Sequence, residues 1–482
     1  MSSKIVVLSV IDQTIVRAYI RNLLFFPFPH LDQAPIAAAR LKKALVTTIS
    51  CWPYLAGTVG PADEDNGKIL LEYNDEIPDV ETSGLFCAKI LDDFLWTYSE
   101  LKEAGVPPSR VPGDIFVPDA LRERDGIDSP IAEGRQSLAS VPIPVLAVQA
   151  NFIQGGLVLS IYCHHSVVDG AGLTIFFEKF ATNMRTESSL GSQADWHTDP
   201  TDPSASRQAL SNLAIPINHQ NPPTCPEISR GLAWKFPRSA NRTRPPCTGR
   251  LFTIAHKRLR LLREELSNTS KDLTIFDVLA ALIWTFVNRA RASHLPEEGN
   301  TTIGIVVNTR HKLDPPLPPD YLGNAALYSM ATLPLCHFVA EDIVTAKTLA
   351  PAAQAIRRAV SVVDDTWVRT RLAFFASLED VRGLRPNINF SFGSDIMLTS
   401  WREFGADLDW SIPGTASRQP EFIRKPFSAE DGGNIIMPRR RLIRDGEEEA
   451  PYEVLMQLAK LDMDALMAEE GGLMSWAIRS VE

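Results

Sequence analysis

The residues best suited to chemistry lie where an apolar segment meets a helical pattern. The apolar run 157–163 is followed by His164 and His165, by Asp169 four residues after the second histidine, and by Gly170. A neutral imidazole in that place can take a proton from a hydroxyl or an amine near neutral pH. Asp169 can orient the imidazole or hold the loop through an ion pair. A packed histidine satisfied by backbone groups fits the short motif equally well.

The segments on either side of these histidines are expected to place them at a rigid, accessible edge. Residues 145–152 are predicted as a strand, residues 154–156 as a tight turn, and residues 157–163 as the return strand. The return strand is apolar enough to be buried on both faces. Large apolar residues at helical spacing after Gly170 then indicate a helix.

Helix and strand patterns alternate in the rest of the chain as well. Residues 35–48 predict a helix that ends before Trp52-Pro53. Residues 274–291 predict another, in which Thr274 can cap free N–H groups and Asp277 lies in the positive first turn. The β-branched residues 302–307 predict a strand. The alternation indicates an α/β (α+β) chain with mixed sheets flanked by helices.

The length of the chain indicates more than one domain. With 482 residues it exceeds one ordinary core, so two or three domains are expected. Residues from about 186 to 226 are polar and proline-rich and show no sustained helical or strand period, as in a linker or a long crossover. We predict an N-terminal domain of residues 1–185, a crossover linker of residues 186–229 and a C-terminal domain of residues 230–482.

Composition argues against several classes of function. Lys plus Arg number 48 and Asp plus Glu number 58, a net charge of −10, so neither nucleic acid nor an anionic membrane is an expected partner. The six cysteines include no C-x-x-C pair, so no metal site and no disulfide framework is predicted. No apolar run approaches the ~20 residues of a spanning helix, and residues 5–8 are too few for a signal peptide. We therefore expect a cytoplasmic protein.

Motifs along most of the chain resemble one family. Residues 164–170 are similar to the H-x-x-x-D-G motif of the BAHD acyltransferases, members of the chloramphenicol-acetyltransferase-like superfamily. Further segments resemble that family's motifs in the same order: L-S-x-x-D-Q at residues 8–13, W-P-x-L-A-G at 52–57, N-x-R…P-P-L-P-x-x-Y-x-G-N at 308–324, T-S-W at 399–401, and the D-G-x-x-x-x-x-P-R of fungal members such as trichothecene O-acetyltransferases at 431–439. The shared order makes the combination specific. The resemblance implies two chloramphenicol-acetyltransferase-like domains with the active-site channel at their interface.

One motif departs from the family pattern. The family has D-F-G-W-G shortly after T-S-W, whereas residues 407–411 read Asp-Leu-Asp-Trp-Ser. Asp407 and Trp410 match, and the phenylalanine and both glycines are replaced. The family motif is structural and lies away from the acceptor, so the departure bears on rigidity and on acyl-CoA affinity. An ordinary surface carboxylate is an equally good reading of Asp407.

The resemblance also implies roles for single residues. His165 resembles the general base that removes the acceptor proton as the acceptor attacks the thioester carbonyl, without a covalent acyl-enzyme. Trp401 resembles the tryptophan whose indole N–H faces the resulting oxyanion; a core tryptophan is the other reading. Asp169 is expected to pair with Arg310, and Gly170, like Gly172, to allow close backbone approach.

Acyl-CoA is the implied co-substrate, with no permanently bound cofactor. Because coenzyme A is anionic, a local cationic rim is needed. Lys257 and Arg258 resemble a region where family members contact the 3′-phosphoadenosine. The alternative interpretation is an ordinary solvent-exposed helix face that binds no ligand. Arg439, Arg440, Arg441 and Arg444 form a second basic cluster. Thr399 and Ser400 can hydrogen-bond the pantetheine arm.

The leading hypothesis is an acyl-CoA-dependent O-acyltransferase that acetylates a hydroxyl of a fungal secondary metabolite. N-acylation would use the same histidine. A condensation-type enzyme that takes its acyl group from a carrier protein is the alternative enzyme, and a catalytically lapsed binding protein of the same fold is the alternative outside catalysis. Because two domains of one chain would share the site, we expect a monomer.

Overall fold

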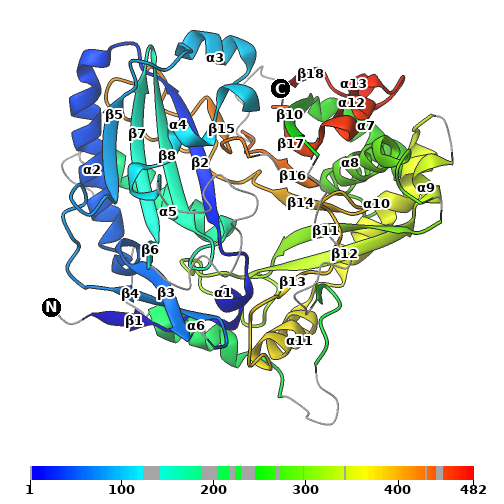
Figure 1. Cartoon of the computed structure of the whole chain (residues 1–482), viewed down its shortest axis with the longest axis horizontal. Coiled ribbons are helices and arrows are strands. Elements are labelled where there is room, and N and C mark those ends of the chain that lie inside the picture. Colours follow the sequence, from blue (N-terminus) through cyan, green and yellow to red (C-terminus); the bar gives the residue numbers. More distant parts are fainter. Residues whose placement is uncertain are drawn as a thin grey trace.

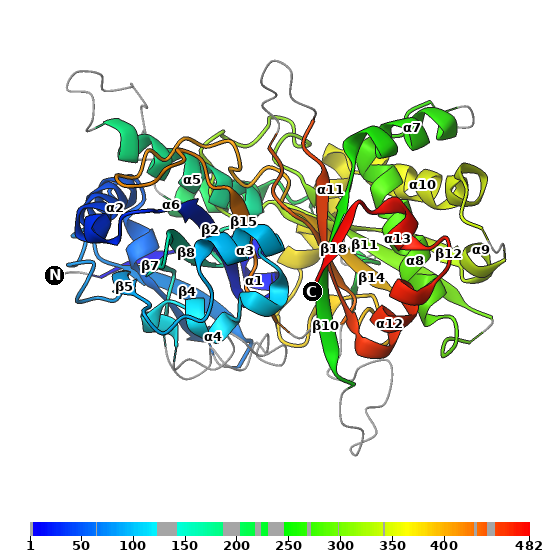
Figure 2. The ribbon, with the colours of Figure 1, turned by 90° about the horizontal axis from the view of Figure 1, so that it is seen from above.

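A computed structural model describes most of the chain: residues 3–63, 65–122, 142–186, 203–216, 223–229, 245–267, 271–296, 298–340, 343–428, 431–440 and 449–482. Two halves lie side by side (Figures 1 and 2). Each is built on a mixed β-sheet that is covered by helices. The chain enters the second half through the crossover and returns once to the first.

The first half is centred on a five-stranded sheet. Its order is β15 (Phe422–Arg424), β2 (Tyr19–Pro27), β8 (Gly156–His164), β7 (Leu146–Ile153) and β5 (Phe86–Ile90), with only β5 and β7 parallel. The strands and turn predicted over residues 145–163 are confirmed as the β7–β8 hairpin, whose strands are buried throughout. A buried hairpin of this kind gives the segment after His164 a fixed starting point.

Helices cover both faces of this sheet. On one face, α2 (Ala34–Ile49) and α5 (Gly170–Thr186) share a core with the strands, which confirms the two helices expected there. On the other face lie α3 (Tyr98–Ala104), the short α4 (Gly113–Phe116) and the 3₁₀ turns Pro108–Arg110 and Asp119–Leu121. Below the sheet in Figure 1, a smaller sheet runs β1 (Lys4–Val6), β4 (Lys68–Tyr73), β3 (Thr58–Asp63) and β6 (Ile143–Pro144), beside α1 (Val10–Thr14). Two more 3₁₀ turns, Leu31–Gln33 and Pro53–Ala56, flank α2.

The second half is built on a seven-stranded sheet. Its order is β12 (Ala326–Pro334), β11 (Asn300–Asn308), β14 (Ile396–Ser400), β16 (Gly433–Ile436), β17 (Tyr452–Ala459), β10 (Cys247–Ile254) and β18 (Arg479–Val481). The pairs β11–β14 and β14–β16 are parallel and the others antiparallel. The strand predicted over residues 302–307 is confirmed as β11.

A central buried helix, α8 (Ile275–Arg291), packs on the outer face of this sheet. Thr274 and Asp277 form the reciprocal capping box expected at its start, because Thr274 Oγ1 accepts from Asp277 N and Asp277 accepts from Thr274 N. Around it lie α7 (His256–Leu266), α9 (Cys336–Val339), α10 (Ala346–Ser361), α12 (Lys460–Ala468) and α13 (Leu473–Trp476). The helix α11 (Asp365–Ala376) packs at the opposite end, next to α1.

A segment of the second half completes the first. After β14 the chain crosses to the first half, where β15 pairs with β2 as an edge strand (Figure 2). On the way, Trp410 is fully buried against the rings of Phe26, Phe177 and Phe180. The predicted boundaries at residues 185 and 230 mark where the chain passes from the first half to the second. The core of the first half also contains residues from beyond position 400.

The crossover contains more structure than its composition predicts. Residues Pro203–Asn212 form helix α6, and Ile228–Ser229 form β9, which pairs with β13 (Arg385–Pro386). Arg207 and Leu210, one turn apart, are both buried. A ten-residue helix of this polarity is marginal alone and is stabilised by tertiary contacts, which a sequence period does not reveal. Residues 187–202 and 217–222 of the predicted linker, and the start of the predicted C-terminal domain at 230–244, lie outside the described residues.

Candidate active site

His165 lies at the end of the β2–β8 ladder, directly before α5. Its backbone N–H donates to the Ala18 carbonyl at 2.8 Å, one step beyond the last paired residues of the two strands. The imidazole is half-buried, and its Nδ1 lies 3.2 Å from Asn324 Oδ1. Burial lowers the pKa of His165, and this effect is partly offset first by a hydrogen bond with its own backbone and then by Asp169, Asn324 and Asp12, so the ring is neutral near pH 7. A neutral, partly accessible imidazole is the form that can accept a proton.

The neighbouring His164 has a different environment. Its side chain is buried against the edge of the Tyr19 ring, and its Nδ1 accepts from Ser166 N at 3.3 Å. Burial, with smaller contributions from His165 and Arg17, lowers the pKa of His164 to about 3. Alternation along a strand puts consecutive side chains on opposite faces, so the doubled histidines point to different sides of the sheet.

Asp169 is part of a buried ion pair with Arg310. Arg310 donates to both carboxylate oxygens of Asp169 at 2.8 Å, and the carboxylate also accepts from Gly172 N and Ala325 N at 2.9 Å. Burial alone would raise the pKa of Asp169, but the Arg310 guanidinium and these N–H groups lower it. Among the described residues these donors account for its hydrogen bonds, so Asp169 holds the two halves together beside His165.

Two glycines permit close approach where the halves meet. A Cβ on Gly172 would lie 2.1 Å from the Leu322 carbonyl oxygen, and one on Gly170 would lie 2.3 Å from the ring of Phe404. Any larger residue at either position would therefore push the start of α5 away from the second half. The geometry fits the close backbone approach expected of both residues.

One edge of the seven-stranded sheet gathers most of the other predicted residues. Because β11, β14 and β16 are parallel, their carboxyl ends share this edge, and the register also places the end of β10 and the start of β17 there. At this edge lie Tyr452, the first residue of β17, and residues that follow β10, β11, β14 and β16, namely His256, Arg310, Trp401 and Arg439. Asn324 lies there too, because it precedes β12, whose first residue pairs with the last residue of β11. Sequence-distant motifs therefore meet at a single boundary that faces the first half.

Trp401 follows β14 at this edge. Its ring stacks on Phe404 at a centroid distance of 5.2 Å, and Phe404 in turn contacts Gly170 at the start of α5. The side chain is 9% exposed, and no hydrogen bond of its indole N–H occurs among the described residues. Phe404 therefore connects the Trp401 ring to the start of α5, the helix that follows His165. Thr399 and Ser400 lie just before it on β14, partly buried and exposed respectively.

Basic side chains surround Tyr452 at the same edge. The guanidinium of Arg439 lies 4.6 Å and the His256 ring 5.9 Å from the Tyr452 ring. Lys257 and Arg258 are exposed in the first turn of α7, where Arg258 lies over Trp476 at 5.2 Å. The structure therefore gathers a cationic surface at this edge of the sheet, with Arg439 packed on Tyr452 and Arg258 on Trp476. Arg441 and Arg444 lie outside the described residues.

Asp407 lies apart from the residues around His165. Its carbonyl accepts from Gln419 Nε2 at 3.0 Å, and its side chain is partly buried in the segment that packs on the first half. The nearby Arg185 donates to the Asp409 carbonyl at 2.7 Å. The replaced motif thus holds the returning segment in place.

Three residues at the site were not identified from sequence: Asn324, Asp12 and Arg207. Asn324 contacts His165, Asp12 accepts from Asn324, and Arg207 forms a buried ion pair with Asp12 at 2.7 Å. Asn324 and Asp12 both lie in motifs that resemble the family, and that resemblance is the sequence signal that could have identified them. No sequence signal pointed to Arg207, because its helix was interpreted as part of the linker.

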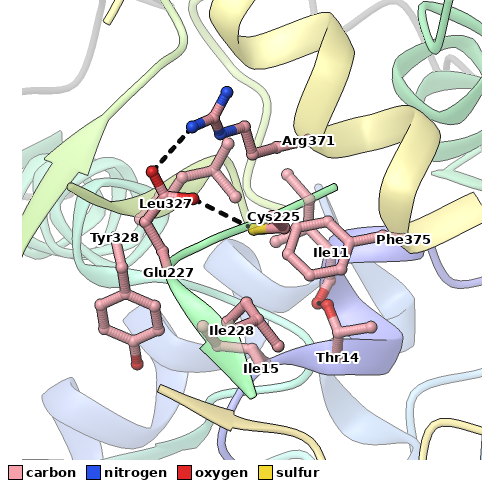
Figure 3. Close-up of a pocket in the computed structure, with 11 residues that line it drawn as sticks. Ile11, Thr14, Ile15, Cys225, Glu227, Ile228, Leu327, Tyr328, Arg371 and Phe375 are labelled. Carbon is pink, nitrogen blue, oxygen red and sulfur yellow. Dashed lines mark hydrogen bonds and ion pairs between the residues drawn. The ribbon is translucent and has the colours of Figure 1, made fainter. Parts of the chain in front are cut away.

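A separate pocket opens on the other side of α1 (Figure 3). Ile11, Ile15 and Phe375 supply apolar walls, and Glu227 pairs with Arg371 at 2.7 Å and accepts from the Cys225 thiol at 3.3 Å. Burial, and then Glu227, raises the pKa of Cys225 to about 12, so this thiol is protonated and a poor nucleophile. None of the residues predicted for the active site lines the pocket.

The described residues contain no group of His, Cys, Asp and Glu side chains arranged to hold a metal ion. In the same part of the chain, no helix has the length and apolar character needed to span a membrane.

Two family models match the sequence and overlap at the His165 motif. The Transferase family model matches residues 131–471, and the trichothecene 3-O-acetyltransferase-like N-terminal domain matches residues 18–182. The chain belongs to the Transferase family, as a BAHD-type acyltransferase. The resemblance read from the motifs is confirmed, and so is the expectation of an acyltransferase enzyme.

Relatives of this acyltransferase extend over its whole length. It is 27% identical over 500 residues to a trichothecene 8-O-acetyltransferase of Fusarium sporotrichioides, which covers 97% of each chain. It is 26% identical over 505 residues to the O-acetyltransferase pboB of Aspergillus ustus, which covers 95% of each. Among solved structures it is similar to F. sporotrichioides TRI101 complexed with coenzyme A and T-2, with a TM-score of 0.75, 20% identity and coverage of 99% and 100%. This likeness confirms the predicted two-domain fold.

Proposed function

We propose that this acyltransferase moves an acetyl group from acetyl-CoA to a hydroxyl of a secondary metabolite of the kind that fungi make. The carrying observation is the neutral imidazole of His165 at the meeting of the two halves, with the indole of Trp401 nearby. Two relatives that match over 95% or more of each chain are named as O-acetyltransferases, which supports the transferred group and the hydroxyl acceptor. The structures of TRI101 with coenzyme A support the donor.

In the proposed reaction His165 takes the proton of the acceptor hydroxyl while its oxygen attacks the thioester carbonyl. A new C–O bond forms and the carbonyl electrons move to oxygen, where the Trp401 N–H can donate to the oxyanion. Such a donor in a water-poor site contributes ~3 kcal/mol. Collapse expels the CoA thiolate, which takes the proton from the imidazolium. No acyl-enzyme is required.

The cationic surface around Tyr452 is the proposed site for the phosphates of the donor. Arg439, Lys257 and Arg258 supply positive charge, and the N-terminus of α7 adds the positive end of its dipole. Thr399 and Ser400 directly precede Trp401 at the end of β14, beside the end of β16, and are the proposed contacts of the pantetheine arm. Because both halves of the site belong to one chain, we further propose that the active form is a monomer. We also propose a cytoplasmic location.

A direct test measures release of CoA thiol from acetyl-CoA, with T-2, deoxynivalenol and a panel of terpenoid alcohols offered as acceptors. The products are identified by the mass of one added acetyl group. Transfer that is lost in His165→Ala supports the proposal. Transfer that persists in His165→Ala would contradict the proposed base, and transfer only from an acyl carrier protein would contradict the proposed donor.

A further inference from the structure

The amide of Asn324 has one possible orientation, because its nitrogen is engaged twice. Asn324 Nδ2 donates to the His165 carbonyl at 2.7 Å and to Asp12 Oδ1 at 2.8 Å. A carbonyl and a carboxylate only accept, so the amide nitrogen must lie on that side. The atom that faces His165 Nδ1 at 3.2 Å is therefore Asn324 Oδ1. Since an amide oxygen also only accepts, His165 Nδ1 carries the proton and the lone pair of the neutral ring is on Nε2.

Asp12 fixes Asn324 from behind. The side chain is completely buried on α1, and its Oδ1 accepts from Asn324 N at 3.0 Å as well as from Asn324 Nδ2. Its Oδ2 accepts from Ser9 N at 2.9 Å and from Arg207 at 2.7 Å. Every partner of this carboxylate is a donor, so the carboxylate cannot turn without breaking several hydrogen bonds at once.

Arg207 joins this group of contacts to the loop that carries the histidine. Its side chain on α6 is 1% exposed, and its second terminal nitrogen donates to the Val167 carbonyl at 2.8 Å. Val167 lies between His165 and Asp169, so one guanidinium holds both the carboxylate behind Asn324 and the catalytic loop. A Cβ at position 323 would lie 2.5 Å from the same guanidinium, so Gly323 is required for Arg207 to reach its place.

We propose that Arg207, Asp12 and Asn324 are positioning residues that set the tautomer of His165, leaving Nε2 free to take the acceptor proton. Asn324 adds to the hydrogen bond that the imidazole makes with its own backbone, whereas both oxygens of Asp169 are engaged by Arg310, Gly172 and Ala325. The crossover between the halves thereby takes part in catalysis. The inference rests on the proposed role of His165 as base, but the tautomer itself can be measured without turnover.

The test is nitrogen NMR on protein with isotope-labelled histidine, in which the His165 signals are assigned by their loss in His165→Gln. In the wild type we expect the pattern of a ring protonated at Nδ1. In Asn324→Leu and in Arg207→Met we expect a shift toward protonation at Nε2, the tautomer that a free neutral imidazole prefers. Asn288→Leu is the matched control, because Asn288 is equally buried and donates to the Trp284 carbonyl at 2.9 Å, within α8. Its His165 signals should not change.

A wild-type ring protonated at Nε2 would overturn the inference even if no variant folds. An unchanged tautomer in folded Asn324→Leu would overturn the role of Asn324, and an unchanged tautomer in folded Arg207→Met would overturn that of Arg207. Failure of the proposed function would show elsewhere, as absence of acetyl transfer with the tautomer still at Nδ1.

Discussion

The imidazole of His165 works in surroundings that disfavour its charged form. Burial lowers its pKa below the ordinary histidine value of 6.5, and a hydrogen bond with its own backbone and the nearby carboxylates only partly offset that effect. The neutral base therefore persists at pH values where an exposed histidine would be protonated. We expect kcat/KM to stay on its plateau as the pH falls below 6.5 and to decline only at the lower, depressed pKa. A pH–rate profile whose acid limb lies at or above the ordinary histidine pKa would contradict this.

Trp401 offers a second test at the scale of one residue. Replacing it with Phe keeps an aromatic ring that can stack on Phe404 and removes the N–H together with the five-membered ring that carries it, so we expect a loss of roughly a hundredfold in kcat. Trp410→Phe is the matched control, since its buried indole N–H also lacks a partner among the described residues but sits in the Phe26, Phe177 and Phe180 core. That control should change thermal stability and leave kcat nearly unchanged. Equal effects of both variants on kcat would argue against an oxyanion contact.

Sequence and structure agree best where a residue and its partner both stand in recognisable motifs. The Asp169–Arg310 pair joins two such motifs and was expected from the resemblance, as were the glycines at the start of α5. Asn324 was within a motif, but nothing in the sequence shows that its amide faces an imidazole 159 residues away. Contacts of that kind depend on side-chain placement after the fold has formed.

At the scale of elements, the approach of α5 to the segment before β12 decides whether the site can assemble. Gly172→Ala would place a methyl group against the Leu322 backbone, which cannot move aside as a flexible side chain can. We expect it to lower the free energy of unfolding by roughly 1–3 kcal/mol and to reduce turnover with it. Denaturant unfolding measures the first effect.

Gly60→Ala is the control for this substitution. The nearest atom to a Cβ there is a Pro142 side-chain carbon at 3.4 Å, an ordinary contact. Its unfolding free energy should stay close to that of the wild type. If Gly172→Ala were equally harmless, the close approach at α5 would not be a requirement of the site.

The elements also show where local patterns are insufficient. The β7–β8 hairpin, α2 and α8 were predicted because each has a strong apolar period or a complete cap. Helix α6 was not, because it has only two buried residues, Arg207 and Leu210, and one of them is charged. Arg207 on this helix pairs with Asp12, which lies 195 residues away in the sequence. No local sequence window contains both residues.

At the scale of the whole molecule, the halves are interlocked by the returning segment. The core of the first half includes Trp410, Ile412 and Ile423 from beyond residue 400, and β15 covers an edge of β2. We expect a fragment of residues 1–229 alone to be insoluble or to lack a cooperative unfolding transition, because it exposes the Trp410 site and an unpaired strand edge. Co-expression with residues 230–482 should restore soluble protein. Cooperative unfolding of the isolated fragment would contradict this account.

The most direct test of the central claim is binding of coenzyme A and acetyl-CoA to wild type and to His165→Ala, followed by thermal unfolding. A ligand at about 100 times its Kd stabilises the folded state by about 2.7 kcal/mol. Both proteins should be stabilised alike, because the proposed donor site is built around Tyr452 and Arg439, and only the wild type should transfer the acetyl group. Absence of stabilisation by either compound in folded wild-type protein would contradict the claim that this interface binds an acyl-CoA donor.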